Sequence, residues 1–160
     1  IALFANLAGC DRPAPEPQAN NTVSETKANP TLDVKKITFL NVTDGDVAAL
    51  WMAIKDKNDD RTYRPQSEEI AKYEHRIRFL ADQLQEDRRM VANRTVQTRD
   101  LLAEQDIHES LLTLLDGMVE VARTGVVGNY GAYCQWYLNL RQSKLDHSAT
   151  IVNMKKLKHK

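Results

Sequence analysis

Three side chains in this sequence could ligate a metal ion, and two of them are at helical spacing. Glu104 and His108 are four residues apart and His75 lies on an earlier apolar segment, so a shared metal is the chemistry to test first. The helical register that we predict places His75 level with Thr113, about five residues or roughly 7 Å from His108 along the axis. A di-iron bundle also needs Glu-x-x-His pairs, which this sequence lacks. We therefore expect no metal site and no cofactor.

Cys134 is the one residue that could act as a nucleophile, and it stands in an apolar segment between Tyr133 and Trp136. A catalytic thiol needs a lowered pKa from a base or from a helix N-terminus, which the start of the last helix could supply. A buried, inert thiol is the more usual case. The sequence contains no Gly-x-Ser-x-Gly elbow, phosphate-binding loop or haem-attachment motif. The residues predict a protein that is not an enzyme.

The segment Leu7-Ala8-Gly9-Cys10 closes an apolar run and opens a proline-rich stretch. It resembles the lipobox of bacterial lipoproteins, in which signal peptidase II cleaves before the cysteine and the thiol carries a diacylglyceryl group. The resemblance implies a signal peptide and fatty acylation of Cys10 with chains such as palmitate. It also implies that the protein is anchored in a bilayer and faces the periplasm, because two or three acyl chains bind a bilayer stably. Asp11 slightly favours the inner membrane, with the outer membrane as the alternative.

The composition divides the chain into three parts. Residues 1–9 are expected to be the end of the signal peptide, whose start lies upstream because no basic residue precedes the apolar run. Residues 10–33 are expected to be the lipidated cysteine and a flexible linker, rich in Pro, Asn, Ser and Thr, that has too little apolar surface to offset the cost of ordering it. Residues 34–160 are expected to form one helical domain. No further motif assigns that domain to a family.

Apolar periodicity predicts an all-α domain. A helix is expected over roughly 46–57, and the run 35–40 is too short for its pattern to separate a strand from a lead-in turn. Two longer stripes follow, with steps of three and four residues between apolar positions. The first contains Ile70, Tyr73, Ile77, Leu80, Leu84 and Val91, and the second contains Val96, Ile107, Leu111, Leu114, Met118 and Val121.

The break between the stripes is predicted near Asn93-Arg94, so that the two stripes form a long antiparallel hairpin. That register pairs Leu80 with Ile107, Ile77 with Leu111, Tyr73 with Leu114 and Ile70 with Met118. A last helix is expected from near Gly131, with a kink near Asp146. The fold class is therefore a small four- or five-helix bundle with coiled-coil-like packing, preceded by a disordered tether.

The charge balance excludes one class of partner. Lys plus Arg and Asp plus Glu number 22 each, so no net field attracts nucleic acid. If Cys10 is acylated, Cys134 is the only free thiol and no intramolecular disulfide can form. The basic C-terminal tail, which contains four lysines and His159 after residue 154, is expected to be a solvated terminus, with contact to anionic lipid as the alternative.

An aromatic cluster marks one candidate interaction site. Four amphipathic rings gather within eight residues, namely Tyr130, Tyr133, Trp136 and Tyr137. Such rings are favoured at protein interfaces, although packing in the core is the other use for them. We expect a membrane-anchored lipoprotein whose helical domain binds another envelope protein, in an immunity, exclusion or envelope-assembly type of role. The alternatives are a binding module for a small apolar ligand or peptidoglycan fragment, with a cavity lined by the tyrosines, and an enzyme with an unrecognised site using residues such as Arg123.

Overall fold

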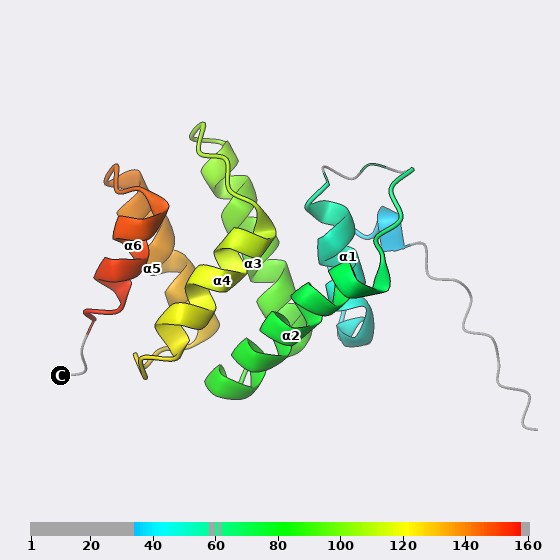
Figure 1. Cartoon of the computed structure of the whole chain (residues 1–160), viewed down its shortest axis with the longest axis horizontal. Coiled ribbons are helices and arrows are strands. Elements are labelled where there is room, and N and C mark those ends of the chain that lie inside the picture. Colours follow the sequence, from blue (N-terminus) through cyan, green and yellow to red (C-terminus); the bar gives the residue numbers. More distant parts are fainter. Residues whose placement is uncertain (1–33, 58–59, 61, 158–160) are drawn as a thin grey trace, which may run out of the picture. The chain divides into compact units, whose positions relative to one another are not determined.

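Capping residues and apolar stripes divide the folded chain into successive helices. The computed structural model describes residues 34–57, 60 and 62–157, all of which belong to one unit (Figure 1). The six α-helices of this part are α1 (Ala48–Lys55), α2 (Ser67–Leu84), α3 (Arg88–Ala103), α4 (Leu111–Ala122), α5 (Tyr130–Gln142) and α6 (His147–Met154). Two short 3-10 turns, η1 (Val34–Lys36) and η2 (Gly45–Val47), precede α1. The described residues contain no strand, so the all-α prediction is confirmed and the ambiguous run 35–40 is a turn and loop.

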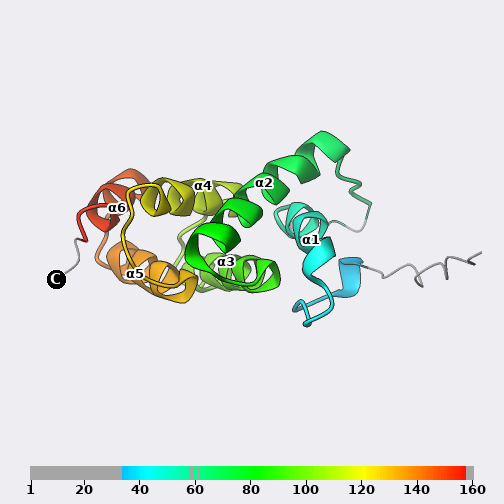
Figure 2. The same cartoon turned by 90° about the horizontal axis from the view of Figure 1, so that it is seen from below.

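Each helix packs on its neighbours along the folded unit. α1 contacts α2 and α3, α4 packs on α2 and α3, and α6 packs on α4 and α5. Figures 1 and 2 both show α1 and α6 at opposite ends of the folded unit, with α3 and α4 between them. The buried side chains form one core that runs through all six helices, and nine of the twelve stripe residues predicted from the sequence are buried in it.

The turn between the two stripes lies earlier than the sequence predicted. α2 ends at Leu84 and is followed by Gln85, which adopts the left-handed conformation with φ 52°. α3 begins after Asp87, whose side chain accepts a hydrogen bond of 2.8 Å from the Arg89 amide. An aspartate that caps a helix N-terminus favours a new helix there. The predicted break at Asn93-Arg94 is therefore wrong, and Asn93 is buried in the middle of α3.

The second stripe is itself interrupted, which changes how the helices pair. α3 ends at Ala103, and Ser110 caps α4 by accepting a hydrogen bond from the Thr113 amide. As a result α2 and α4 run in the same direction. Arg76 binds Asp116 with two hydrogen bonds of 2.5 and 3.2 Å, and the Arg123 guanidinium lies 5.4 Å from the Phe79 ring centroid. α2 and α3 form the antiparallel hairpin, but the register predicted for it is wrong, because it assumed one uninterrupted return helix.

The kink expected near Asp146 is a break between two separate helices. The Asp146 side chain accepts a hydrogen bond of 2.7 Å from the Ala149 amide and so starts a separate helix, α6. With the division of the second stripe, this raises the number of helices to six within the described residues, rather than four or five. Among those residues, no helix is both long enough and apolar enough to cross a bilayer.

Candidate interaction surface

The aromatic cluster predicted as an interaction site lies in the core. Tyr130, Tyr133 and Tyr137 are all 0% exposed, and only Trp136 is partly exposed. Their polar tips are satisfied inside the protein, as expected for buried tyrosines. Thr95 donates to the Val91 carbonyl, so the Tyr130 hydroxyl donates to Thr95 across 2.6 Å. The cluster therefore forms no exposed patch, and the alternative use that the sequence left open, core packing, is the observed one.

Cys134 belongs to the same buried network. Burial raises its pKa to about 11, with smaller opposing effects from Thr98 and Arg94. Because the thiolate is the reactive form, a thiol with this pKa is protonated and unreactive near neutral pH. Burial also raises the pKa of Tyr130 well above its ordinary value. These groups hold α5 against α3 and offer no nucleophile.

The other predicted polar residues do not come together. His75, Glu104 and His108 are all exposed, and the described residues contain no cluster of three His, Cys, Asp or Glu side chains that could hold a metal ion. Arg123 stacks on Phe79 and does not face a pocket with the two histidines. Cys10 lies outside the described residues, so its acylation stays a prediction.

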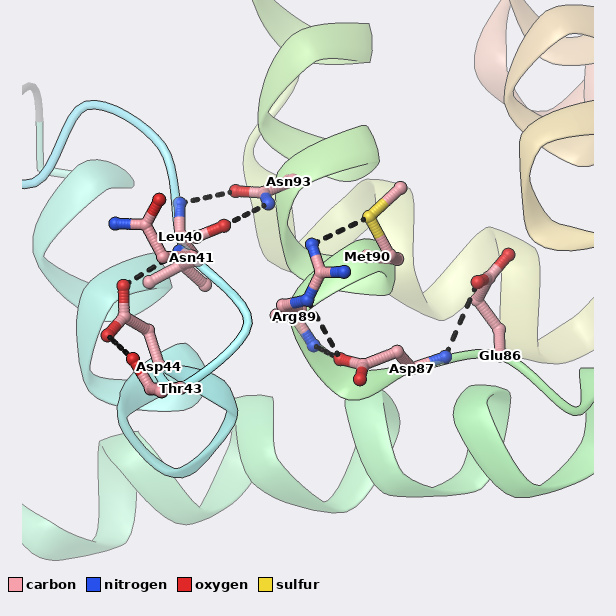
Figure 3. Close-up of polar contacts among 9 residues, drawn as sticks. All are labelled: Leu40, Asn41, Thr43, Asp44, Glu86, Asp87, Arg89, Met90 and Asn93. Atoms are coloured by element: carbon pink, nitrogen blue, oxygen red, sulfur yellow. Dashed lines mark hydrogen bonds and ion pairs between the residues drawn. The ribbon is translucent and has the colours of Figure 1, made fainter.

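A loop that the sequence did not single out carries the most exposed apolar side chains of the N-terminal half. We call residues 37–44 the pinned loop, because side chains from two helices fix its backbone. The Trp51 indole donates to the Ile37 carbonyl across 2.8 Å. The Asn93 side chain accepts from the Leu40 amide at 2.9 Å and donates to the Leu40 carbonyl at 3.0 Å (Figure 3). The loop is therefore held at several points by α1 and α3.

The pinned loop also closes on itself. Asp44 precedes the turn η2 but its side chain makes no cap hydrogen bond there, and instead accepts from the Asn41 amide at 2.7 Å (Figure 3). Leu40 is 0% exposed, whereas Phe39 is 55% exposed and Val42 is 76% exposed. The loop buries one apolar side chain as an anchor and presents two others to solvent in a fixed position.

A groove of about 300 Å³ opens beside Phe39, between the pinned loop and α3. Its apolar lining comes from Phe39, Trp51, Val96 and Leu101, and Leu101 is itself 37% exposed. We call this feature the Phe39 groove. An open apolar groove with a polar rim is the usual form of a site for a side chain of a binding partner.

The charged residues that line the Phe39 groove are both acidic. Asp100 and Glu104 lie one helical turn apart on α3. Asp100 is paired with Arg99 at 2.7 Å, and Arg99 also donates to the Lys55 carbonyl across 2.7 Å. Glu104 has no ion pair within the described chain and sits at the C-terminal end of α3, where the helix dipole is negative. Among the described residues, Glu104 is therefore the carboxylate of the rim that is available to a cationic partner.

A second carboxylate organises the neighbouring surface. Asp56 accepts hydrogen bonds of 2.7 Å from the Tyr73 hydroxyl and from the Leu111 amide, so it joins α1 to α2 and to the start of α4. Burial and this hydrogen bond raise the pKa of Tyr73. Asp56 lines two clefts, of about 440 and 480 Å³. Its own oxygens are occupied by backbone and hydroxyl donors, so its role is to hold three helices together.

Sequence reasoning missed the residues of the groove for identifiable reasons. Phe39 stood in a run too short to interpret by periodicity, and Asn93 was assigned to a break between helices. The available signal was an asparagine on the buried side of an apolar helical stripe, because a buried amide must find partners.

The comparison with known proteins identifies one family. No curated protein and no solved structure matches the chain. A family model, MoxZ, matches residues 49–159, which is more than two thirds of the chain and covers all of α2 to α6. The expectation that the folded domain has no recognisable family is therefore wrong. The chain belongs to the MoxZ family.

Proposed function

We propose that this protein is a lipid-anchored component of the bacterial envelope, facing the periplasm, and that its helical domain binds another protein through the Phe39 groove. It is a non-enzymatic docking domain, held at the membrane through Cys10 and the linker at 10–33. The lipobox residues 7–10 support the anchor, and the exposure of Phe39 on a fixed loop supports the docking role.

The exposure of Phe39 is the observation that carries this proposal. A phenylalanine that is left largely in water forgoes about 1.5–3 kcal/mol of burial energy. Flexible loops can fold such a side chain inward, but Trp51 and Asn93 fix the backbone on either side of Phe39. A preorganised apolar side chain loses little conformational entropy when a partner covers it. The arrangement therefore favours binding at the cost of the stability of the free protein.

Site-specific crosslinking tests the docking role. The photoreactive residue p-benzoylphenylalanine replaces Phe39 in the full chain, in cells. Val127 provides a matched control because it is 68% exposed in the loop between α4 and α5 and does not line the groove. We expect a discrete adduct with another envelope protein from position 39 and none from position 127. Phe39→Asp should then abolish binding of that purified partner. Equal adducts from both positions, or none from position 39, would refute the proposed docking site.

The anchor has its own test. Metabolic labelling with palmitate should mark the full-length gene product, and Cys10→Ser should remove the label and release the protein from membranes. Label that persists in the Cys10→Ser protein would show that the acyl chain, and the location inferred from it, are assigned wrongly.

A further inference from the structure

The two ends of the folded unit carry complementary surfaces. At one end, the Phe39 groove has an apolar lining and only acidic residues among its charged ones. At the other end, the chain leaves α6 through Lys155, Lys156 and Leu157, and the sequence continues with Lys158, His159 and Lys160, which lie outside the described residues. Leu157 is 41% exposed and follows the exposed Lys156, so the end of the described chain presents an apolar side chain next to a cation.

Each end has one charged side chain that is available for an ion pair with another copy. Lys155 binds Glu120 within its own copy, whereas Lys156 is exposed and has no ion pair in the described part of the chain. Glu104 is likewise exposed and has no ion pair among the described residues. We propose that the Phe39 groove of one copy takes the C-terminal tail of a second copy, with Leu157 between Phe39 and Leu101 and Lys156 beside Glu104.

The tail cannot fill the groove of its own copy. Leu157 lies three residues beyond the end of α6 at Met154, a span of at most about 11 Å. α6 packs on α4 and α5, whereas the groove belongs to the pinned loop, α1 and α3. Figures 1 and 2 both place α6 and α1 at opposite ends of the folded unit. The tail can therefore reach this groove only in another copy of the chain.

Such a contact joins two different surfaces, so it is heterologous and can extend from copy to copy. One leucine and a few lysines cover far less than the roughly 1,200 Å² of a stable protein interface. The association is consequently weak and depends on concentration. This inference rests on the proposed function, because it uses the same groove and makes the tail a competitor of the envelope partner.

A charge exchange tests the contact on the purified full chain carrying Cys10→Ser, by sedimentation velocity over a range of concentrations. We expect the wild-type tail and groove to give reversible association. Leu157→Asp, Glu104→Lys and Lys156→Glu should each raise the dissociation constant by about tenfold or more, because each removes an apolar contact or places like charges together. Glu68→Lys is the matched control on an exposed site that belongs to neither surface, and it should leave the dissociation constant unchanged.

Mixing variants gives the decisive result. Glu104→Lys copies and Lys156→Glu copies should associate with each other better than either does alone, since the lysine at position 104 of one meets the glutamate at position 156 of the other. The double variant should also recover association. Monomers at every concentration, or single variants that associate like the wild type, would overturn the proposal, provided that thermal unfolding shows each variant folded.

Two further outcomes separate this inference from its alternatives. If phosphatidylglycerol vesicles bind the chain, Lys156→Glu abolishes that binding, and Glu104→Lys has no effect on self-association, then the tail is a lipid-binding segment and the proposal fails. If the purified chain is monomeric but position 39 still crosslinks to an envelope protein, the self-association is refuted and the proposed function stands. If position 39 crosslinks only to a second copy of the chain while the charge exchange succeeds, the proposed function fails and the groove serves self-association alone.

Discussion

Asn93 is the residue on which the shape of the pinned loop depends, because one amide satisfies both backbone groups of Leu40. Asn93→Ala should lower the free energy of unfolding by about 1–3 kcal/mol, since it leaves a buried N–H and a buried carbonyl without partners. Chemical denaturation measures this loss. Hydrogen exchange of the Leu40 amide should accelerate in the same variant.

Gln97→Ala is the control for that substitution, because Gln97 lies on the same helix with its side chain exposed. It should change the unfolding free energy by less than about 0.5 kcal/mol. If Asn93→Ala changed the unfolding free energy equally little, other contacts would hold the loop, and Asn93 would not be what fixes the position of Phe39.

The sequence could not reveal the role of Asn93 because its partner is 53 residues away. Asparagine has a low helix propensity, and local rules therefore favour a helix boundary there. The same limit applies to the tyrosines. Their spacing identified a cluster, but only the packing of α5 on α3 decides that Tyr130 and Tyr133 are inside. Residue type and local spacing identify side chains that can pack or bind, but they do not show whether those side chains are buried or exposed to solvent.

At the scale of elements, the apolar stripes were predictable and their directions were not. Tyr73, Ile77, Leu80, Leu111 and Leu114 are all in the core, as their spacing required. The direction of pairing depends on where each helix stops. Asp87 and Ser110 are both good N-caps, yet many Asp and Ser residues with similar neighbours cap nothing. The turn lies near residue 86 instead of 93, and a further break separates α3 from α4. α4 therefore runs in the same direction as α2, instead of the opposite one.

Gly117 controls how closely α4 and α6 approach. A Cβ added there would lie 2.6 Å from the Ile151 Cδ1 atom and 2.9 Å from the His147 Cε1 atom, both on α6. Gly117→Val should therefore lower the unfolding free energy by about 1–3 kcal/mol through overpacking. Thermal and urea unfolding provide the measurement.

Gly45→Val is the matched control for Gly117, because nothing lies within 4 Å of a Cβ added at Gly45 and its backbone is not left-handed. It should be nearly neutral. A destabilisation at position 45 as large as that at 117 would mean that loss of glycine itself, rather than the α4–α6 contact, accounts for the effect.

At the scale of the whole molecule, the family match and the physical unit differ at the N-terminal side. The MoxZ match begins at residue 49, within α1, and leaves out the pinned loop. Packing places the boundary earlier. Leu40 is fully buried against the helices and both Trp51 and Asn93 bind the loop backbone. Phe39 on one side of the groove thus precedes the part that the family model describes, whereas Leu101 and Glu104 on the other side lie within it.

A pair of truncations tests where the folding unit begins. A chain of residues 34–160 should keep the unfolding midpoint of the full chain, whereas a chain of residues 45–160 should lose at least about 3 kcal/mol, because it removes the buried Leu40 side chain and leaves the Asn93 amide without partners. Should the shorter chain fail to fold, Leu40→Ala in the full chain measures the same contact and should cost about 2–5 kcal/mol. Equal stability of both truncated chains, with a neutral Leu40→Ala, would mean that the loop is peripheral. Phe39 would then be exposed on a mobile segment, and the groove beside it would have to form anew with each partner.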